Sequence, residues 1–469
     1  MTRRTVLAAL ALAATLLLAP AAALAHGLVG KQDLPIPRWL FAWAAAIVLV
    51  VSFVALAVLW PTARWQRTPE RTLVRLPALL DPLCGTLGLA LFAVAVYAGL
   101  AGNQSANENL LPTLMFVIFW VGLPIVSLLF GDVFRAVNPW RALARFGGWL
   151  AARVGRSAPP EPLPYPARLG YWPAAIGIVA FVWVELIYGG RTDPSKLAVL
   201  ALAYAAVQLV GMSIYGVEAW SRRADAFGVY FGLFARLSPL RWTRRALLGR
   251  RPFSAAAQFE VLPGAVALVC FVIGTTSFDG FSLHALWTSL AQTLQDALRS
   301  LGLSPGPALQ WAFTIGLLAV VGLVYGFYRL GIEGVRTVAP GRSGGELAGA
   351  FAHTLIPIAL AYVIAHYFGL LAYQGQAIAY LASDPLGDGS DLFGTANAAI
   401  DYTWISATAV WYVQVATLVS GHAIALALAH DRALALYGAT KTAVRSQYWM
   451  LAIMVGFTCL ALWLLSGQG

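Results

Sequence analysis

The chain has 469 residues, of which 60% are hydrophobic and 11% are charged, and its mean hydropathy is +0.74. Soluble domains are about 45–50% apolar and about 25% charged, so this composition excludes a water-soluble globular protein. The formal net charge of +11 does not indicate a nucleic-acid partner, because basic residues beside membrane spans usually record orientation in the membrane. Cys84, Cys270 and Cys459 form no close pair in the sequence, which argues against a disulfide framework or a thiolate metal site.

The N-terminus has the three parts of a secretory signal peptide. Arg3 and Arg4 precede an apolar run over residues 6–18, and the small-residue cleavage signal Ala23-Leu24-Ala25 follows. Cleavage there removes residues 1–25 and leaves His26 as the first residue of the mature chain. The alternative is an uncleaved signal that stays as an anchor. Both versions place His26 outside the cell membrane.

Ten apolar segments follow, and each is about 20 residues long, enough to cross about 30 Å of hydrocarbon. They predict an all-α fold, a polytopic helical bundle in which residues 26–469 form a single transmembrane domain. The expected spans are residues 38–60, 83–101, 111–130, 171–189, 197–219, 259–276, 310–331, 350–373, 403–428 and 447–465.

The distribution of basic residues supports this number of spans and fixes an orientation. With His26 outside, the loops on the cytoplasmic side contain 24 of the 31 Lys and Arg residues, the external segments contain five and the signal contains two. Loops that stay in the cytoplasm are enriched in Lys and Arg, and one missed span would invert the pattern beyond the error. We therefore expect both ends of the mature chain to be external.

Two apolar stretches are expected not to span the membrane. Residues 281–301 place leucines at helical spacing with polar residues between them, which predicts an external amphipathic helix lying on the membrane. Residues 226–238 are apolar and aromatic but too short to span. Because arginines follow them, we expect a segment that lies on the cytoplasmic surface.

Ionisable residues at membrane depth are the best candidates for chemistry in such an apolar chain. Glu185, near the outer end of the fourth span, is expected at the same level as His366 in the outer half of the eighth span. The external connection before the ninth span adds Asp384, Asp388 and Asp391. We take Glu185 and these three aspartates as candidate catalytic carboxylates.

The same outer face has the donor atoms of a divalent metal site. Histidine nitrogens and carboxylate oxygens suit Zn or Cu, and the candidate ligands are His26, His284, His366 and Asp279. The alternative interpretation is structural. Aspartates are common in turns because their side chains bond nearby backbone groups, and His284 would then be a residue of the membrane interface.

A second pair of histidines is expected near the cytoplasmic ends of two antiparallel spans. His353 in the eighth span and His422 in the ninth could meet, and paired intramembrane histidines can bind haem or a metal or relay protons. The alternative is that each ring only makes a hydrogen bond between helices.

Three separated blocks resemble, in the same order, bacterial membrane proteins known as fenitrothion hydrolases. The blocks are His26-Gly-Leu-Val-Gly-Lys-Gln-Asp-Leu-Pro-Ile-Pro-Arg-Trp-Leu-Phe-Ala-Trp, Asn138-Pro-Trp-Arg-Ala-Leu and Asp384-Pro-Leu-Gly-Asp-Gly-Ser-Asp-Leu-Phe-Gly-Thr. The resemblance runs from His26 to the C-terminus and assigns no catalytic residue. It implies a multi-pass protein of the bacterial cytoplasmic (inner) membrane, with periplasmic termini.

The resemblance also implies an activity, the hydrolysis of an organophosphorus triester at its P–O-aryl bond. Such a substrate is a neutral, lipophilic small molecule that partitions into the lipid bilayer, so an enzyme open to the outer interface is expected. A metal ion would lower the pKa of bound water and polarise the phosphoryl oxygen or sulfur, and an aspartate would act as general base. Two other functions stay open: copper or other metal handling by the same outer residues, and haem or quinone redox chemistry at His353 and His422.

Overall fold

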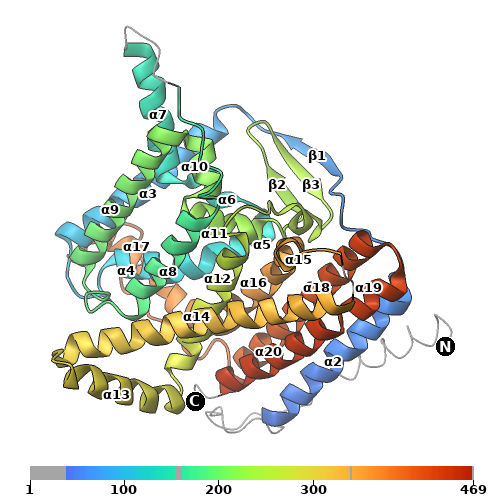
Figure 1. The fold of residues 1–469 in the computed structure, drawn as a ribbon. Coiled ribbons are helices and arrows are strands. Elements are labelled where there is room, and N and C mark those ends of the chain that lie inside the picture. Colours follow the sequence, from blue (N-terminus) through green and yellow to red (C-terminus); the bar gives the residue numbers. More distant parts are fainter. Residues whose placement is uncertain (1–37, 155–160, 339–340, 467–469) are drawn as a thin grey trace.

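The computed structural model describes residues 38–154, 161–338 and 341–466 (Figure 1). The expected signal peptide and His26 lie outside these ranges. Within them, nine helical segments are long and apolar enough to cross a membrane, which confirms the all-α, multi-pass prediction. Six of them consist of one helix, and the first five of these are α2 (Arg38–Leu59), α3 (Leu80–Ala101), α9 (Pro194–Tyr215), α12 (Ala265–Ser282) and α14 (Pro305–Val338).

The other four long segments include α18 (Ala407–Tyr437) and three runs of consecutive helices. The first run contains α4 (Leu110–Thr113), the π-helix η1 (Leu114–Gly122) and α5 (Leu123–Phe130). The second contains α15 (Gly344–Phe351), η3 (Ala352–Leu355), α16 (Ile356–Gln374), η4 (Gly375–Ala377) and α17 (Ile378–Ser383), and the third contains α19 (Thr440–Ser446) and α20 (Tyr448–Ser466).

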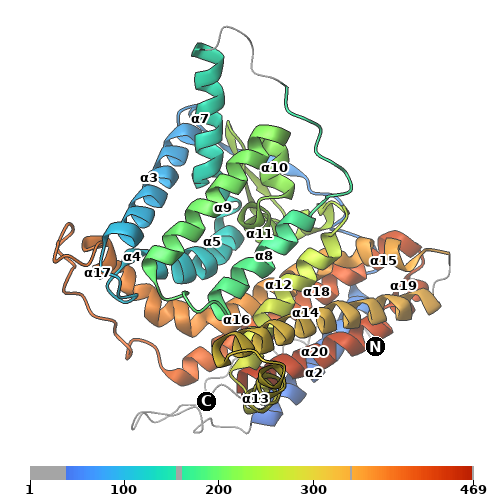
Figure 2. The same cartoon turned by 60° about the vertical axis from the view of Figure 1, so that its left-hand side comes forward.

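The one expected span that is not among these nine segments, the fourth (residues 171–189), forms the shorter helix α8 (Trp172–Leu186). Its 15 residues extend about 22 Å at 1.5 Å per residue, less than the thickness of the hydrocarbon core. The remaining helices are α6 (Val133–Val137), α7 (Pro139–Val154), α10 (Val217–Arg223), α11 (Ala226–Ala235), η2 (Ser254–Gln258) and α13 (Ala285–Ser300). In Figures 1 and 2, α7 projects from the body of the bundle.

Prolines account for the breaks inside two long segments. Pro124 has no N–H to donate, and just before it the hydrogen bonds widen to five residues, with Leu123 N donating to Ile118 O. Pro357 lies in the first turn of α16, directly after the 3₁₀ turn η3. Both breaks are expected, because a proline in a helix removes a hydrogen bond and bends the axis.

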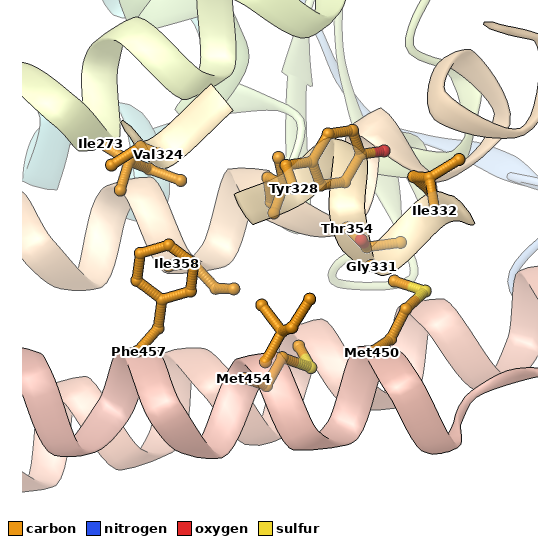
Figure 3. A pocket seen from close by; sticks show the side chains of 12 residues that line it. Ile273, Val324, Tyr328, Gly331, Ile332, Thr354, Ile358, Met450, Met454 and Phe457 are labelled. Carbon is orange, nitrogen blue, oxygen red and sulfur yellow. The ribbon is translucent and has the colours of Figure 1, made fainter. Parts of the chain in front are cut away.

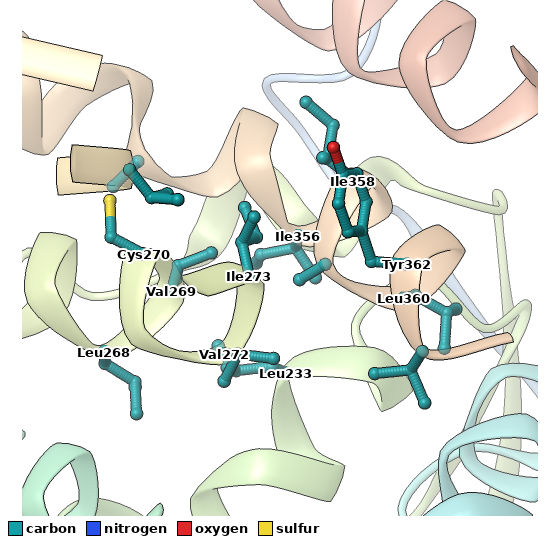
Figure 4. Packing of buried hydrophobic residues seen from close by; sticks show 14 of the residues in the cluster. Leu233, Leu268, Val269, Cys270, Val272, Ile273, Ile356, Ile358, Leu360 and Tyr362 are labelled. Atoms are coloured by element: carbon teal, nitrogen blue, oxygen red, sulfur yellow. The ribbon is translucent and has the colours of Figure 1, made fainter. Parts of the chain in front are cut away.

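Helix α12 lies at the centre of the bundle. In its most apolar window 72% of the residues are buried, compared with 17% in the peripheral helix α2. It packs against α8, α14 and α16, and Figure 4 shows its side chains Leu268, Val269 and Val272 within the core. Groups carried by α12 and by its neighbour α16 are therefore held by packing on several sides.

A three-stranded antiparallel sheet covers one end of the bundle, which we call the sheet end. Strand β3 (Ala246–Arg250) lies between β1 (Glu70–Arg75) and β2 (Leu240–Trp242). We call the other end the distal end. There the loop after α3 contacts the loop after α17, and Asn103 N donates to Leu386 O at 2.7 Å. Segments far apart in the sequence thus meet at each end.

A buried carboxylate fastens the sheet-end loop to α18. Asp431 accepts hydrogen bonds from the indole of Trp60 at 3.1 Å, the backbone N–H of Trp65 at 3.1 Å and the side chain of Gln66 at 2.6 Å, and also from the backbone N–H of Arg64. Asp431 is fully buried. Because several donors share this one acceptor, the contact ties the loop after α2 to the bundle.

Two expectations about non-spanning segments have different outcomes. The surface location expected for residues 226–238 is wrong: α11 is buried, and Tyr230, Phe231 and Phe234 are fully inaccessible. The reason is that its aromatic side chains pack between α5 and α8. The amphipathic helix expected over residues 281–301 is present as α13, which packs on α14 through Trp287 while Leu286 is exposed.

The block Asn138-Pro-Trp has a structural role at the sheet end. The Asn138 side-chain amide and the Trp140 indole N–H donate to Oδ2 of the buried Asp225, at 2.9 and 2.8 Å. The hydroxyl of Tyr204 donates to the other carboxylate oxygen at 2.7 Å. These contacts join α7 and α9 to the start of α11.

Candidate functional site

A hydrogen-bonded Asp–His pair joins α12 to α16. Oδ2 of Asp279, in the last turn of α12, lies 2.7 Å from Nε2 of His366. The two side chains are 13% and 11% exposed. Because charge-assisted hydrogen bonds are strong where water is scarce, this contact fixes the orientation of the imidazole ring.

Two more polar side chains surround the pair. The hydroxyl of Tyr367, which follows His366 on α16, interacts with the Asp279 carboxylate. Glu185, in the last turn of α8, is an electrostatic neighbour of both Asp279 and Tyr367. Helices α8, α12 and α16 thus bring two carboxylates, an imidazole and a phenol together at the same depth.

Two polar atoms in the same region are buried without a hydrogen-bond partner among the described residues. They are Oε2 of Glu185 and the hydroxyl of Tyr230, whereas the indole of Trp120 is a hydrogen-bond neighbour of Tyr367. The rings of Trp120 and Tyr230 stack with their centroids 4.4 Å apart, and Tyr230 is an electrostatic neighbour of Glu185. A buried polar group without a partner costs about 1–3 kcal/mol, and such groups are usually explained by function.

A small cavity of about 20 Å³ lies beside His366. Its walls come from α12, α16, α18 and α20, and they include Thr276, Ser277 and Tyr362. The hydroxyls of Thr276 and Ser277 donate to backbone carbonyls one turn earlier, at 3.2 and 2.8 Å. These hydroxyls keep oxygen lone pairs for a guest, so the cavity offers acceptors next to the imidazole.

His284 belongs to a helix cap and has no described contact with the Asp–His pair. Its Nδ1 accepts a hydrogen bond from Leu286 N at 3.2 Å at the start of α13, and its ring lies 4.2 Å from the ring of Trp463, centroid to centroid. This is the interfacial, structural arrangement that the sequence left open. His26, the remaining candidate ligand, lies outside the described residues.

The three loop aspartates bind their own loop. The two carboxylate oxygens of Asp384 accept from the backbone N–H groups of Asp388 and Gly389, at 3.0 and 2.9 Å. Asp391 accepts from the Ser383 hydroxyl at 2.6 Å, and this bond lowers the pKa of the Asp391 carboxyl. This is the behaviour of turn aspartates.

Asp388 follows the same pattern, because its Oδ1 accepts from both the backbone N–H and the hydroxyl of Ser390. The hydroxyl bond lowers the pKa of the Asp388 carboxyl. Among the described residues, no hydrogen bond links these loop aspartates to the Asp–His pair.

The two inner histidines occupy separate places. His422 is fully buried, its Nδ1 donates to Leu418 O at 2.9 Å, and its ring centroid lies 6.1 Å from that of Tyr362. His353 is also buried and lies in η3. In the part of the chain that the structure describes, Nε2 of each ring has no partner and no contact joins the two rings.

The described residues contain no group of three or more His, Cys, Asp or Glu side chains placed to hold a metal ion. Asp279 and His366 supply one carboxylate and one imidazole, which are two of the four ligands that zinc usually takes. A metal centre would therefore need further ligands, and His26 is the candidate that the sequence offers.

Sequence reasoning did not find the aromatic part of the site. Trp120, Tyr230 and Tyr367 were not candidates, and Tyr230 lies in the segment expected on the surface. One signal was present: a tyrosine in a short, otherwise apolar segment has a hydroxyl that needs a partner once the segment is buried. Tyr362, one turn before His366 on α16, carries the same signal.

Comparisons with known protein families, with curated proteins and with solved structures find no match to this chain. The resemblance to fenitrothion hydrolases therefore stays a prediction from the sequence blocks alone.

Proposed function

We propose that the chain is a membrane-bound hydrolase that cleaves the P–O-aryl bond of lipophilic organophosphorus triesters. The observation that carries the proposal is the Asp279–His366 hydrogen bond of 2.7 Å beside a cavity within the helical bundle. A neutral, lipophilic ester reaches such a site from the bilayer, where charged substrates are excluded.

The Asp–His pair supplies a general base for water. Asp279 orients the imidazole of His366 through their hydrogen bond and stabilises the imidazolium that forms when the ring takes up a proton. The water oxygen bonds to phosphorus, its proton passes to His366, and the P–O-aryl bond breaks. The proton then passes to the leaving aryloxide. A positioned general acid or base of this kind raises the reaction rate by about 10²- to 10⁴-fold.

A divalent metal, Zn or Cu, belongs to the proposal as an assisting group. In that form of the site Asp279 and His366 would be metal ligands instead of the base for water, together with ligands outside the described residues. The metal would lower the pKa of water and polarise the phosphoryl oxygen or sulfur. Metal analysis of the purified protein tests this part, and hydrolysis by protein without stoichiometric metal would remove it.

The distribution of charge supports an orientation for the site. Arginines are concentrated at the sheet end, where β1 and β3 alone contain Arg71, Arg75 and Arg250, and basic loops stay in the cytoplasm. We therefore assign the sheet end to the cytoplasm and the distal end to the periplasm of a bacterial inner membrane. Asp279 and Glu185, each near the distal end of its helix, then face the outer leaflet.

The experiment is an assay of aryl alcohol release by membranes that contain the protein, with and without chelator. Asp279→Asn and His366→Ala should each lower turnover by at least about 100-fold. Asp391→Asn is the matched control, because it changes a carboxylate of the distal loop that only binds its own turn, and turnover should persist. Equal turnover by the wild type and His366→Ala would overturn the proposal.

The alternative function, metal handling, uses the same candidate metal ligands on the outer face, but it predicts a different experimental result. It predicts metal uptake into proteoliposomes without ester turnover. The haem or quinone alternative at His353 and His422 gains no support from the cavity beside His366, since neither histidine lines it. A Soret absorption band in purified protein would revive it.

A further inference from the structure

The interior of the bundle beside α14 leaves little room for a ligand. The cavity in Figure 3, between α12, α14, α16 and α20, has a volume of about 50 Å³, whereas ligand pockets usually have about 300–1,000 Å³. Its two hydroxyls, of Tyr328 and Thr354, already donate to backbone carbonyls at 2.7 and 2.8 Å. This space is therefore a gap in packing, and the apolar surface that still lacks a partner lies outside the bundle, on α7.

Helix α7 changes from buried to exposed along its length. Its first residues, up to Arg141, are buried, whereas every residue from Phe146 to Val154 is exposed. A Cβ added at Gly147 or Gly148 would meet nothing within 4 Å. In Figures 1 and 2 this outer half of α7 projects from the bundle. It is thus open to whatever surrounds the protein.

One side of the outer half is apolar. Leu143, Phe146, Leu150 and Val154 follow one another at intervals of three, four and four residues, the spacing that places side chains on one face of a helix. Their exposed fractions are 39%, 56%, 44% and 75%. At the edge of this face the ring of Trp149 stacks on that of Phe146, with centroids 5.8 Å apart. We call these five residues the α7 face.

Water alone is a poor environment for the outer half. Helices of fewer than about 12–15 residues are marginal in water without packing, and the adjacent glycines Gly147 and Gly148 weaken this one further. Large apolar side chains exposed together on a helix usually mark a contact with a membrane or a protein. An apolar environment that covers the α7 face would therefore stabilise the helix.

The inner half of α7 is fixed to the sheet end by ion pairs. Arg141 contacts Glu218 at 2.8 Å and Asp81 at 3.5 Å, and Arg145 contacts Asp81 at 2.5 Å. Asp81 lies in the first turn of α3, where that span begins at the sheet end. In both Figure 1 and Figure 2, α14 lies across the view while α7 stands upright. Helix α7 thus runs across the long spans, and its outer half leaves the side of the bundle where α3 begins.

The charge of α7 favours an anionic surface. The helix contains three arginines and no Asp or Glu. Arg141 and Arg145 have carboxylate partners, whereas Arg153 lies over the ring of Trp149, 5.2 Å from its centroid, and has no carboxylate partner among the described residues. Arginine beside exposed aromatic and leucine side chains is typical of helices that lie in the interface of an anionic membrane. A second copy of the same face would bring like charges together, whereas lipid phosphates are complementary to them.

We propose that the outer half of α7 is an in-plane anchor that binds anionic phospholipids of the cytoplasmic leaflet. The α7 face lies in the hydrocarbon just beneath the headgroups, and the guanidinium of Arg153 lies at their phosphates. The cytoplasmic leaflet is the one at the sheet end, and its negative surface attracts basic segments. The anchor is remote from the Asp279–His366 pair, so the proposal does not depend on hydrolysis.

The test places an environment-sensitive fluorophore on α7 of the full-length protein in lipid nanodiscs. Leu150→Cys puts the probe on the α7 face, and Ala152→Cys, two residues further, puts it on the opposite side as the matched control. Labelled wild type gives the background from the native cysteines. Phospholipids that are spin-labelled near the top of the acyl chain should quench the probe at residue 150 several-fold more strongly than the probe at residue 152. Equal quenching at the two positions would overturn the anchor.

Lipid composition and charge test the class of lipid. In nanodiscs that contain phosphatidylglycerol, Arg153→Gln should lower the ratio of docked to undocked α7 about fivefold, as expected for one arginine at an anionic surface. In phosphatidylcholine alone the same substitution should have little effect. Energy transfer between probes at residue 150 of two copies, without quenching by lipid, would show that a second copy covers the face and would overturn the proposal. Quenching that is the same in both lipids would overturn the selectivity for anionic lipid.

Discussion

Nε2 of His366 and Oδ2 of Asp279 lie 2.7 Å apart, although 87 residues separate them in the sequence. The contact joins two parallel helices of the core, and it places an oriented imidazole beside a cavity. A buried pair of this kind is costly in stability unless each partner satisfies the other. The proposed hydrolysis therefore depends on both residues of the pair.

The two residues should behave as one unit in kinetics. His366→Ala removes the proposed base, and Asp279→Asn removes the group that orients it, so each should lower turnover strongly. The double variant should be no worse than His366→Ala alone, because residues that act as a unit are not additive. The measurement is kcat/KM for the three variants. Losses that multiply in the double variant would show that the residues act independently.

Tyr230→Phe should not reduce stability. The Tyr230 hydroxyl is buried without a partner among the described residues, so its removal should leave the melting temperature unchanged or raise it. Tyr328→Phe is the matched control. That hydroxyl donates to Ala348 O, and its loss should cost about 1 kcal/mol. Thermal unfolding in detergent measures both, and a lower melting temperature for Tyr230→Phe would show that its hydroxyl is satisfied.

Asp431→Ala should be among the most destabilising substitutions of a carboxylate. It leaves several half-buried donors of the loop after α2 without an acceptor, and an unsatisfied polar group costs about 1–3 kcal/mol when it is fully buried. Asp296→Ala removes only an exposed pair with Arg299 at 3.8 Å, which is worth at most about 1 kcal/mol. The melting temperature should fall clearly for the first variant and hardly for the second, and equal effects would contradict the anchoring role.

Glu218 should make the sheet end sensitive to acid. Burial raises the pKa of this carboxyl, but the charges of Arg135 and Arg141, at 2.6 and 2.8 Å, outweigh burial and lower the pKa from 4.5 to about 2. A carboxyl with a lowered pKa stabilises the fold above its unfolded pKa and loses this contribution as pH falls through the folded value. Its contribution is thus complete above pH 4.5 and fades between 4.5 and about 2.

The measurement compares wild type and Glu218→Gln in thermal unfolding at several pH values. The variant should be less stable at pH 6, and the difference should shrink as pH falls below 4.5. Because the carboxyl is 44% exposed, solvent screening keeps the effect small. A difference that stays constant down to pH 2 would contradict the assigned ion pairs.

Close helix packing should depend on Gly88 and not on Gly326. A Cβ at Gly88 would lie 1.7 Å from the backbone oxygen of Val137, whereas at Gly326 it would meet nothing within 4 Å. Gly88→Ala should therefore reduce the yield of folded protein, and Gly326→Ala should be neutral or stabilising, since alanine favours helix. Size-exclusion profiles of the two variants check this, and normal folding of Gly88→Ala would show that α3 and α6 can separate.

Hydropathy was sufficient to predict the long helices, because a segment of about 20 apolar residues has few conformations other than a helix that satisfy its backbone hydrogen bonds in a membrane. It was insufficient for α11, whose ten apolar residues suit burial in protein as well as the interface. Hydropathy also overestimated the length of α8, because the residues directly after Leu186 are still apolar although the helix ends there. Both errors concern short segments whose environment depends on their neighbours.

The candidate site was predictable by residue type but not by contact. Glu185, His366 and Asp279 were recognisable as ionisable groups in apolar segments, and the structure brings these three together. Nothing local in the sequence pairs residue 279 with residue 366, because that contact follows from how α12 packs on α16. His284 and Asp384 show the reverse, since their local roles as a helix cap and a turn residue are the ones that the structure shows.

The measurement that tests the central claim most directly is hydrolysis of an aryl phosphotriester in ¹⁸O-labelled water by the reconstituted protein. The account predicts that the label enters the phosphate product, because water attacks phosphorus, and that His366→Ala abolishes this incorporation while Asp391→Asn does not. Label in the aryl alcohol, or incorporation that is unchanged in His366→Ala, would contradict it.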